Sequence, residues 1–336
     1  MTSFEERVNF LRLSSENGKK PLPRVTLGAV NRDGSLQYAK AFGEASVEST
    51  EADDYIVSVL PEWGNPRILT GFDENDSPIF RPATKPVTRR YIFPTFEPGE
   101  RWMYSPGIDW AGKAVERVTS MKLCEYLQRH VFDIVSVKYA TFHLDQKEDL
   151  HARKVKAWVR TDQGLQEEKS PIFQDPIAED IGGGRIYSTV NELLKICHGI
   201  LTEKLLRPET VKEMFQPQLE SLKDLDQPHE YSLASRNAIW NAIPNDVPVN
   251  FGIGGLVNTS ALPKRRAAYS LTWSGKPNCY WWIGINNGIA GIYLSQLLPT
   301  SDQTTIELLT KFERWVYSRL DEVGCPPKQD VDISSR

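Results

Sequence analysis

Residues suited to stabilising a negatively charged intermediate stand late in the chain, in the run Leu271-Thr-Trp-Ser-Gly275. A backbone N–H on a strand whose glycine permits close approach can donate to a negatively charged oxygen that develops on a bound substrate. We therefore predict that Trp273, Ser274 and Gly275 line a substrate site and supply half of an oxyanion hole. The same residues also fit an ordinary edge strand with a Ser-Gly turn, and both interpretations stay open.

Histidine and cysteine show no pattern that suggests a metal centre. The five histidines have no metal-ligand spacing, and the four cysteines are widely spaced without a Cys-x-x-Cys pair. We predict no metal site, no cofactor and reduced thiols. The sequence also has no Gly-x-Ser-x-Gly nucleophile elbow and no phosphate-binding loop of the Gly-x-x-x-x-Gly-Lys type.

The sheet that would hold Trp273 is predicted from patterns near both ends of the chain. Two β-rich runs, 25–30 and 36–42, flank an Asp-Gly turn and predict a hairpin. Helical spacing of apolar residues predicts an opening helix over 4–13 and a closing helix over 303–320. Four more β-rich segments, separated by Gly, Pro and Asn turns, lie at 251–257, 267–273, 279–285 and 289–296.

The aromatic run Tyr280-Trp281-Trp282 lies on one of these segments. Because side chains alternate faces along a strand, we predict that at least two of the three pack in the core.

The middle of the chain is predicted to be helical and irregular. Residues 50–95 are rich in Pro, Asp and Arg, which indicates irregular structure with one short hairpin around Asp73-Glu-Asn-Asp76. Residues 139–160 alternate like a strand or a strand pair. Helices are predicted over 107–118 and 122–132, after a cap at Ser188 or Thr189, and over 208–215.

Together these elements predict a mixed α/β (α+β) fold, with an antiparallel sheet flanked by N- and C-terminal helices. We expect a single domain over 1–336. Its sheet-plus-helix part would comprise 1–48 and 250–322, and its helical and irregular part 49–249.

Composition excludes two classes of partner. The formal net charge is −4 and no basic stripe is present, so we expect no nucleic-acid binding. The apolar runs are too short to span a bilayer and the start does not resemble a secretory signal, so we expect no membrane partner and a cytoplasmic location.

Three segments resemble motifs of one enzyme superfamily. Pro98-Gly-Glu-Arg-Trp-Met-Tyr104-Ser-Pro-Gly107, which leads to Gly112, resembles the second motif of class C β-lactamases and their esterase relatives. The run Gly182-Gly-Gly-Arg-Ile-Tyr-Ser-Thr189 is similar to the glycine-rich start of a family helix, and Trp273-Ser-Gly275 stands where the superfamily has Lys-Thr-Gly, His-x-Gly or Trp-Gly-Gly. The chain therefore resembles the serine-β-lactamase/penicillin-binding-protein superfamily, in the fungal esterase branch with lovastatin-type side-chain acyltransferases.

This resemblance implies a β-lactamase/transpeptidase-like fold and acyl transfer from a small-molecule ester or thioester to an alcohol or to water. It implies no metal or redox cofactor, and a place in fungal secondary metabolism. It assigns Tyr104 a catalytic role as proton relay or oxyanion partner, although a buried aromatic residue before a helix would fit the same position. We therefore expect Tyr104 and the strand of Trp273 to converge on one hollow.

The family's nucleophile is missing from the sequence. A Ser-x-x-Lys motif puts both side chains on one helical face, where the amine can take the hydroxyl proton. No lysine here has a serine three residues before it, and Thr119-Ser-Met-Lys122 is the only threonine match. The motif and a second family segment would fall at Thr50-Glu51 and between Arg90 and Tyr91, so the helical subdomain is predicted to be partly deleted. A catalytically inactive binding protein and a truncated gene model are the alternatives.

Overall fold

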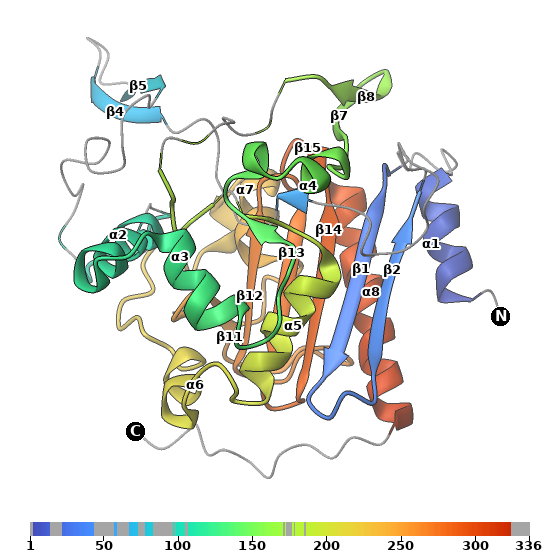
Figure 1. Cartoon of the computed structure of the whole chain (residues 1–336). Helices are drawn as coiled ribbons and strands as arrows, with labels where there is room; N and C mark the ends of the chain where they lie inside the picture. Colours follow the sequence, from blue (N-terminus) through green and yellow to red (C-terminus); the bar gives the residue numbers. More distant parts are fainter. Residues whose placement is uncertain are drawn as a thin grey trace.

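A seven-stranded antiparallel sheet forms the centre of the molecule, in the order β10-β11-β12-β13-β14-β1-β2 (Figure 1). The computed structural model describes residues 3–13, 22–43, 57–58, 67–72, 78–82, 97, 99–104, 107–170, 172, 177, 179–184 and 186–323. The strands are Val25–Asn31 (β1), Gln37–Phe42 (β2), Val249–Gly252 (β10), Gly255–Asn258 (β11), Ser270–Gly275 (β12), Cys279–Gly284 (β13) and Ile289–Ser295 (β14).

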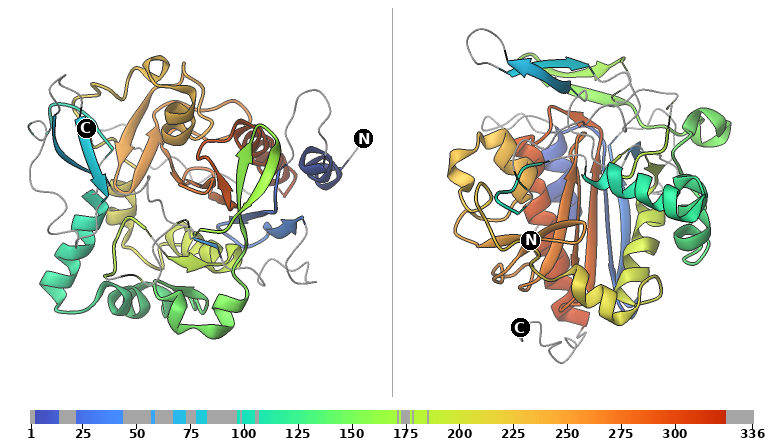
Figure 2. Two further views of the ribbon diagram at one scale, coloured as in Figure 1. Left: turned by 90° about the horizontal axis from the view of Figure 1, so that it is seen from above. Right: turned by 90° about the vertical axis from the view of Figure 1, so that its left-hand side faces the viewer.

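Both faces of this sheet are covered, so its central strands are buried on both sides. All residues of β1 and β14 are buried. Successive side chains point to opposite faces. In β1, Leu27 and Ala29 therefore join the core that contains residues of α8 (Gln303–Val323), whereas Val30 joins the core that contains residues of α5 (Val190–Leu201). Figure 2 shows the sheet between these two helices.

The C-terminal helix α8 is fixed to its face of the sheet by apolar contacts and by a buried charge. Phe312 and Val316 are fully buried, and Phe4 of α1 (Phe4–Leu13) stacks on Trp315 with ring centroids 4.6 Å apart. The carboxylate of Glu313 is fully buried and forms ion pairs with Arg265 and Arg266 at 2.6 and 2.8 Å. These two arginines lie in the loop before β12, so the ion pairs join the helix to the sheet.

On the opposite face α5 lies close against β1. The Thr189 side chain accepts a hydrogen bond from the backbone N–H of Glu192, which caps the helix start, as predicted. Gly28 makes the close approach possible, because a Cβ at this position would lie 2.5 Å from Cγ2 of Val190.

Helices and short strands outside the sheet complete the part of the chain that the structure describes. The helices are α2 (Gly107–Thr119), α3 (Leu123–Leu127), the π-helical turn η4 (Gln128–Phe132), the 3-10 turn η5 (Leu144–Gln146), α4 (Glu148–Ala152), α6 (Pro208–Met214), the 3-10 turn η6 (Pro228–Glu230) and α7 (Leu233–Trp240). The strands are β3 (Val57–Ser58), β4 (Arg67–Phe72), β5 (Pro78–Pro82), β6 (Ala140–Thr141), β7 (Ala157–Thr161), β8 (Gly164–Glu168), β9 (Tyr187–Ser188) and β15 (Leu297–Leu298).

The predicted fold class is confirmed, as are the opening hairpin, both terminal helices and the β4–β5 hairpin. The strand prediction for 139–160 was wrong, because only Ala140–Thr141 and Ala157–Thr161 are extended and α4 lies between them. The single strand predicted over 251–257 is a hairpin, since Gly254 turns the chain at φ +99°. Helix α7 was not predicted. The chain has no helix, among the described residues, that is long and apolar enough to cross a membrane.

Candidate functional site

Trp273 lies on β12, on the same face of the sheet as its neighbour Trp281 on β13. Its side chain is only 7% exposed. The ring of Phe251, from β10, meets it edge-on with centroids 5.2 Å apart. This T-shaped contact is a favoured aromatic geometry and holds the indole in one orientation.

Tyr104 stacks on this indole. The two ring centroids are 6.1 Å apart and the ring planes differ by 15°. Tyr104 lies in the segment before α2. In the same segment, Trp102 donates its backbone N–H to the Lys223 carbonyl at 3.0 Å. At 38% exposure the tyrosine is reachable from solvent. The structure therefore brings together two residues that the motifs placed 169 positions apart in the sequence.

The other two predicted binding residues lie differently. Ser274 is buried on the opposite face of the sheet from Trp273, where its hydroxyl donates to the Ala238 carbonyl of α7 at 2.6 Å. Gly275 pairs with Cys279 at the end of β12. Among the described strands, β11 pairs with β12 only as far as Thr272, so the backbone of 273–275 is unpaired along that side. Of Ser274 and Gly275, only main-chain groups therefore lie along this unpaired side.

A cavity of about 350 Å³ lies beside Tyr104. Its walls are mainly apolar, and an ion pair between Arg101 and Asp224 lies at its margin. The Tyr231 hydroxyl donates to the backbone carbonyl of Asp224 at 2.5 Å, and burial, followed by the charge of Asp224, raises the pKa of this phenol. Trp273 contacts the ring of Tyr104 without lining the cavity itself, which departs from the shared hollow that we expected.

The glycine-rich turn at 182–184 positions α2, the helix that follows Tyr104. The Gly183 N–H donates to Oδ1 of Asp109 in the first turn of α2 at 2.7 Å. A Cβ at Gly182 would lie 2.3 Å from the Ile108 carbonyl oxygen, so only glycine allows this contact. The first two of the three motif segments, 98–112 and 182–189, are therefore adjacent in space.

The Thr119-Ser-Met-Lys122 quartet does not form a nucleophile site. The Thr119 hydroxyl donates to the Val115 carbonyl at 2.7 Å and accepts from the Met121 N–H at 3.3 Å, which closes the end of α2. Lys122 serves as the N-cap residue of α3. The positions at Thr50-Glu51 and Arg90-Tyr91, where the motifs indicate that family segments are missing, lie outside the described residues.

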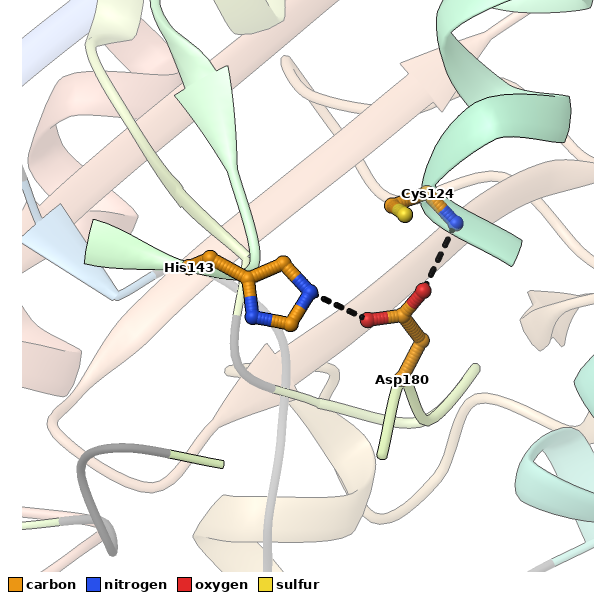
Figure 3. A group of neighbouring side chains, drawn as sticks. All are labelled: Cys124, His143 and Asp180. Carbon is orange, nitrogen blue, oxygen red and sulfur yellow. Dashed lines mark hydrogen bonds and ion pairs between the residues drawn. The ribbon is translucent and has the colours of Figure 1, made fainter. Parts of the chain in front are cut away.

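A second cluster was not predicted from the sequence. Figure 3 shows Cys124, His143 and Asp180 gathered at one point, with one potential ligand atom of each within 4.8 Å of the others. Burial, and then a hydrogen bond to Asp180, raises the pKa of the Cys124 thiol to about 11. The cluster has no sequence signal, because its members come from three separate segments.

Comparison with known proteins places the chain in a family. The beta-lactamase family model matches residues 83–311, more than half of the chain. The ML-236A carboxylate methylbutanoyltransferase mlcH of Penicillium citrinum is 23% identical over 90% of this chain and 91% of its own length. The lovastatin esterase of Penicillium rubens is 26% identical over 80% of this chain and 78% of its own length.

Solved structures show the same fold. A mutant of simvastatin synthase (LovD) from Aspergillus terreus superposes with a TM-score of 0.77 at 24% identity, covering 90% of this chain and 91% of that one.

The alignment with the Penicillium citrinum protein also shows that this chain is internally shorter. Because 90% of 336 residues is about 300, about 80 of the 382 aligned positions hold a residue of that relative and none of this chain. Such a difference agrees with the omission of whole segments that the motifs indicate. Shortened as it is, the chain belongs to the beta-lactamase family, with fungal acyltransferases and an esterase among its relatives.

Proposed function

We propose that this protein is an acyltransferase or carboxylesterase-like protein that acts on a small-molecule ester or thioester. The observation that carries the proposal is the stack of Tyr104 on Trp273 beside an apolar cavity, in a chain of the beta-lactamase family. The cavity is within the size range of small-molecule sites and lies next to a phenol that solvent can reach.

The proposed reaction needs one proton transfer and one site for negative charge. The bond from the acyl carbon to the donor sulfur or oxygen breaks, and a bond to the acceptor oxygen forms. The acceptor's proton passes to the leaving group. Tyr104 would relay this proton, and backbone N–H groups on the unpaired side of 273–275 would stabilise the developing oxyanion.

The relatives suggest the substrate class. A methylbutanoyltransferase and a lovastatin esterase act at the same kind of bond, one forming an ester and the other cleaving it. We infer that the acyl donor is a short branched thioester or ester and that the acceptor is an alcohol of a fungal secondary metabolite. A cytoplasmic location fits such substrates.

A second candidate function is non-catalytic binding of a small molecule. It is favoured by one observation, the absence of Ser-x-x-Lys from the sequence. Without that serine and lysine, the covalent step of the family cannot occur at its usual position.

One experiment separates the two candidates. The full chain is incubated with a methylbutanoyl thioester and ML-236A carboxylate, and with lovastatin alone, while product formation and intact protein mass are followed. Acyl transfer or ester hydrolysis above the rate in buffer is expected, and a stable mass increase would identify an acylated residue. A folded chain that binds these compounds but neither converts them nor gains mass is a binding protein.

The missing segments can be tested at the level of the gene. Sequencing the transcript across the junctions at Ser49–Asp53 and Arg90–Phe93 is expected to show whether a helix with Ser-x-x-Lys is encoded there. An in-frame Ser-x-x-Lys would assign covalent acyl transfer to the longer product.

A further inference from the structure

Cys124, His143 and Asp180 converge from three segments that are distant in the sequence. Cys124 is the second residue of α3, His143 follows β6, and Asp180 precedes the glycine-rich turn. A thiol, an imidazole and a carboxylate are the three most common protein ligands of zinc. Their ligand atoms lie within 4.8 Å of one another (Figure 3).

Asp180 is the centre of this cluster and is arranged as a metal ligand would be. Its side chain is 3% exposed, and Oδ2 accepts the backbone N–H of Cys124 at 2.9 Å. Its other oxygen, Oδ1, is buried and accepts no well-angled hydrogen bond from the described residues, although Nε2 of His143 lies 2.9 Å away.

The order of the contacts argues against a catalytic Cys-His-Asp triad. In a triad the imidazole stands between the nucleophile and the carboxylate, because it takes the proton from one and is oriented by the other. Here the carboxylate stands between, with one oxygen towards the backbone of Cys124 and the other towards His143. The arrangement suits a chelate, in which all three groups face one point.

The distances are close to those of a tetrahedral zinc site. Zinc bonds of about 2.0–2.3 Å put neighbouring ligand atoms about 3.3–3.6 Å apart. The N···O pair at 2.9 Å must open by a few tenths of an ångström, and the sulfur must approach by about 1 Å at most from the 4.8 Å limit. A thiolate and a carboxylate together carry two negative charges, which a divalent cation neutralises in this buried place.

A cavity lies next to the cluster, on the side of Cys124. Cys124 lines a cavity of about 260 Å³, whose wall also contains Lys138, Lys147 and Asp149. Three protein ligands leave the fourth position of a tetrahedral ion open, and this cavity can supply a water molecule or a small anion to it. The two lysines favour an anionic fourth ligand.

We propose that Cys124, His143 and Asp180 bind one zinc ion, with a fourth ligand from the adjoining cavity. Binding breaks the S–H bond of Cys124, forms a zinc–sulfur bond and releases the proton to solvent. The ion would join α3, the segment after β6 and the loop before Gly182, and so stabilise the helical part of the molecule. The proposal does not rest on acyl transfer at Tyr104, and its test measures metal binding alone.

The test uses the full chain, freed of metal with a chelator and titrated with Zn²⁺ by calorimetry and with Co²⁺ by absorption. One Zn²⁺ per chain is expected, and Co²⁺ is expected to give an intense thiolate-to-cobalt band with the visible spectrum of a tetrahedral ion. Mg²⁺, which prefers oxygen ligands, is expected not to bind at this site.

Variants assign the site to its residues. Cys124→Ser, His143→Gln and Asp180→Asn are each expected to weaken Zn²⁺ binding roughly tenfold or more. His151→Gln removes an exposed imidazole nearby in the sequence and Cys197→Ala removes a core thiol, and both controls are expected to retain full affinity. Far-UV circular dichroism confirms that each variant is folded.

Two results would overturn the proposal. One is the absence of a thiolate-to-cobalt band in the wild-type protein. This result does not depend on whether any variant folds. The other is a folded Cys124→Ser chain that binds Zn²⁺ as tightly as the wild type. Peptide mapping adds an independent check. Zn²⁺ is expected to protect Cys124 from alkylation in the folded protein, whereas Cys124 of an unfolded sample is expected to be alkylated.

Discussion

Trp273 stands between two aromatic rings, and this position explains why its neighbourhood can be rigid while Tyr104 stays accessible. Phe251 holds the indole edge-on from β10, and the phenol of Tyr104 covers its face. The indole is nearly buried, whereas the phenol is more than a third exposed. Trp273 is held in place by Phe251, and the ring of Tyr104 packs on it while remaining partly exposed. Such an arrangement suits a residue that relays protons.

This arrangement predicts a clean separation of stability from activity at Tyr104. Tyr104→Phe keeps the ring stack and removes only the hydroxyl, so the free energy of unfolding is expected to fall by no more than about 1.5 kcal/mol, the net contribution of one hydrogen bond. Loss of a proton relay is expected to lower kcat for acyl transfer or ester hydrolysis by roughly 10²-fold or more, with little change in KM. Urea unfolding and steady-state kinetics measure the two quantities.

The control for this prediction is Trp273→Phe, which weakens the stack but leaves the hydroxyl in place. Its main effect is expected on KM and stability. An unchanged kcat in Tyr104→Phe would show that the phenol has only a packing role.

At the residue scale, sequence reasoning succeeded where a motif existed. The order of motifs led us to expect that Tyr104 and Trp273 lie close together, and their rings are in contact. Alternation along β13 predicted that at least two aromatic residues are buried, which Tyr280 and Trp282 confirm. The cluster around Asp180 could not be predicted, because ligand spacing is informative only when the ligands share one local element.

Among the elements, the contact between α2 and the glycine-rich turn carries the most consequence for the site. Ile108 and Asp109 in the first turn of α2 touch Gly182 and Gly183 directly. Tyr104 stands only a few residues before this helix, so its position depends on where α2 lies.

Gly182→Ala is therefore expected to disturb both stability and the site. The new methyl group would lie 2.3 Å from the Ile108 carbonyl oxygen and push α2 away, at a cost of about 1–3 kcal/mol. Chemical denaturation gives the loss of stability, and quenching of tryptophan fluorescence reports a displaced Tyr104–Trp273 contact.

Gly34→Ala is the matched control for this substitution. Gly34 has a φ of +77° and open space around it, so alanine there suffers backbone strain without collision. If the two variants lose the same stability and show the same tryptophan fluorescence, the close approach of α2 to the glycine-rich turn does not position the site.

Elements whose apolar residues recur with one clear period were predicted correctly. Elements that are short and separated by turns were not. The strands β1, β13 and β14 and the helix α8 are long enough for their apolar pattern to be distinctive. In residues 139–160, by contrast, Leu144 and Leu150 each anchor a separate short helical turn in one small cluster with Tyr187. The even spacing of Leu144 and Leu150 resembles the alternation of a strand. The sequence alone does not show that the two leucines pack on Tyr187, which lies about 40 residues further along the chain.

Across the whole molecule, one buried carboxylate connects the last helix to the sheet. Glu313 accepts hydrogen bonds from both Arg265 and Arg266, and all three side chains are buried. Burial alone would raise the pKa of Glu313, but the charges of Arg266 and Arg265 lower it below its ordinary value. In the sequence these arginines form a basic run with Lys264, and nothing in that run indicates a carboxylate 47 residues further along the chain.

Glu313→Gln is expected to be among the most destabilising single changes in this protein. It leaves two buried guanidinium groups without their anion, at a cost of about 3–5 kcal/mol. Glu322→Gln breaks an exposed pair with Arg319 and is expected to cost less than about 1 kcal/mol. Comparable losses in the two variants, measured by urea unfolding, would contradict the role given to the buried pair.

The same group predicts a dependence of stability on pH. Because the native pKa of Glu313 is lower than its ordinary value of 4.5, the stabilisation is complete above that value and is lost as the pH falls through the native pKa. Wild-type stability is therefore expected to fall more steeply below about pH 4.5 than that of Glu313→Gln. If the free energies of unfolding of the wild type and of Glu313→Gln fall in parallel with pH, other carboxylates dominate acid unfolding.

The pairing of β1 with β14 has a consequence for how the chain is made. Val25 pairs with Phe42 on one side and with Ser295 on the other, so β1 can form its hairpin with β2 early but cannot pair with β14 until almost the entire polypeptide has left the ribosome. At about 5–20 residues per second this delay lasts on the order of 10–50 seconds. During that time the β1–β2 hairpin has no further strand to pair with, and Leu27 and Ala29 lack the core that they join in the folded protein, so chaperones that shield this hairpin are expected to raise the yield of recombinant protein.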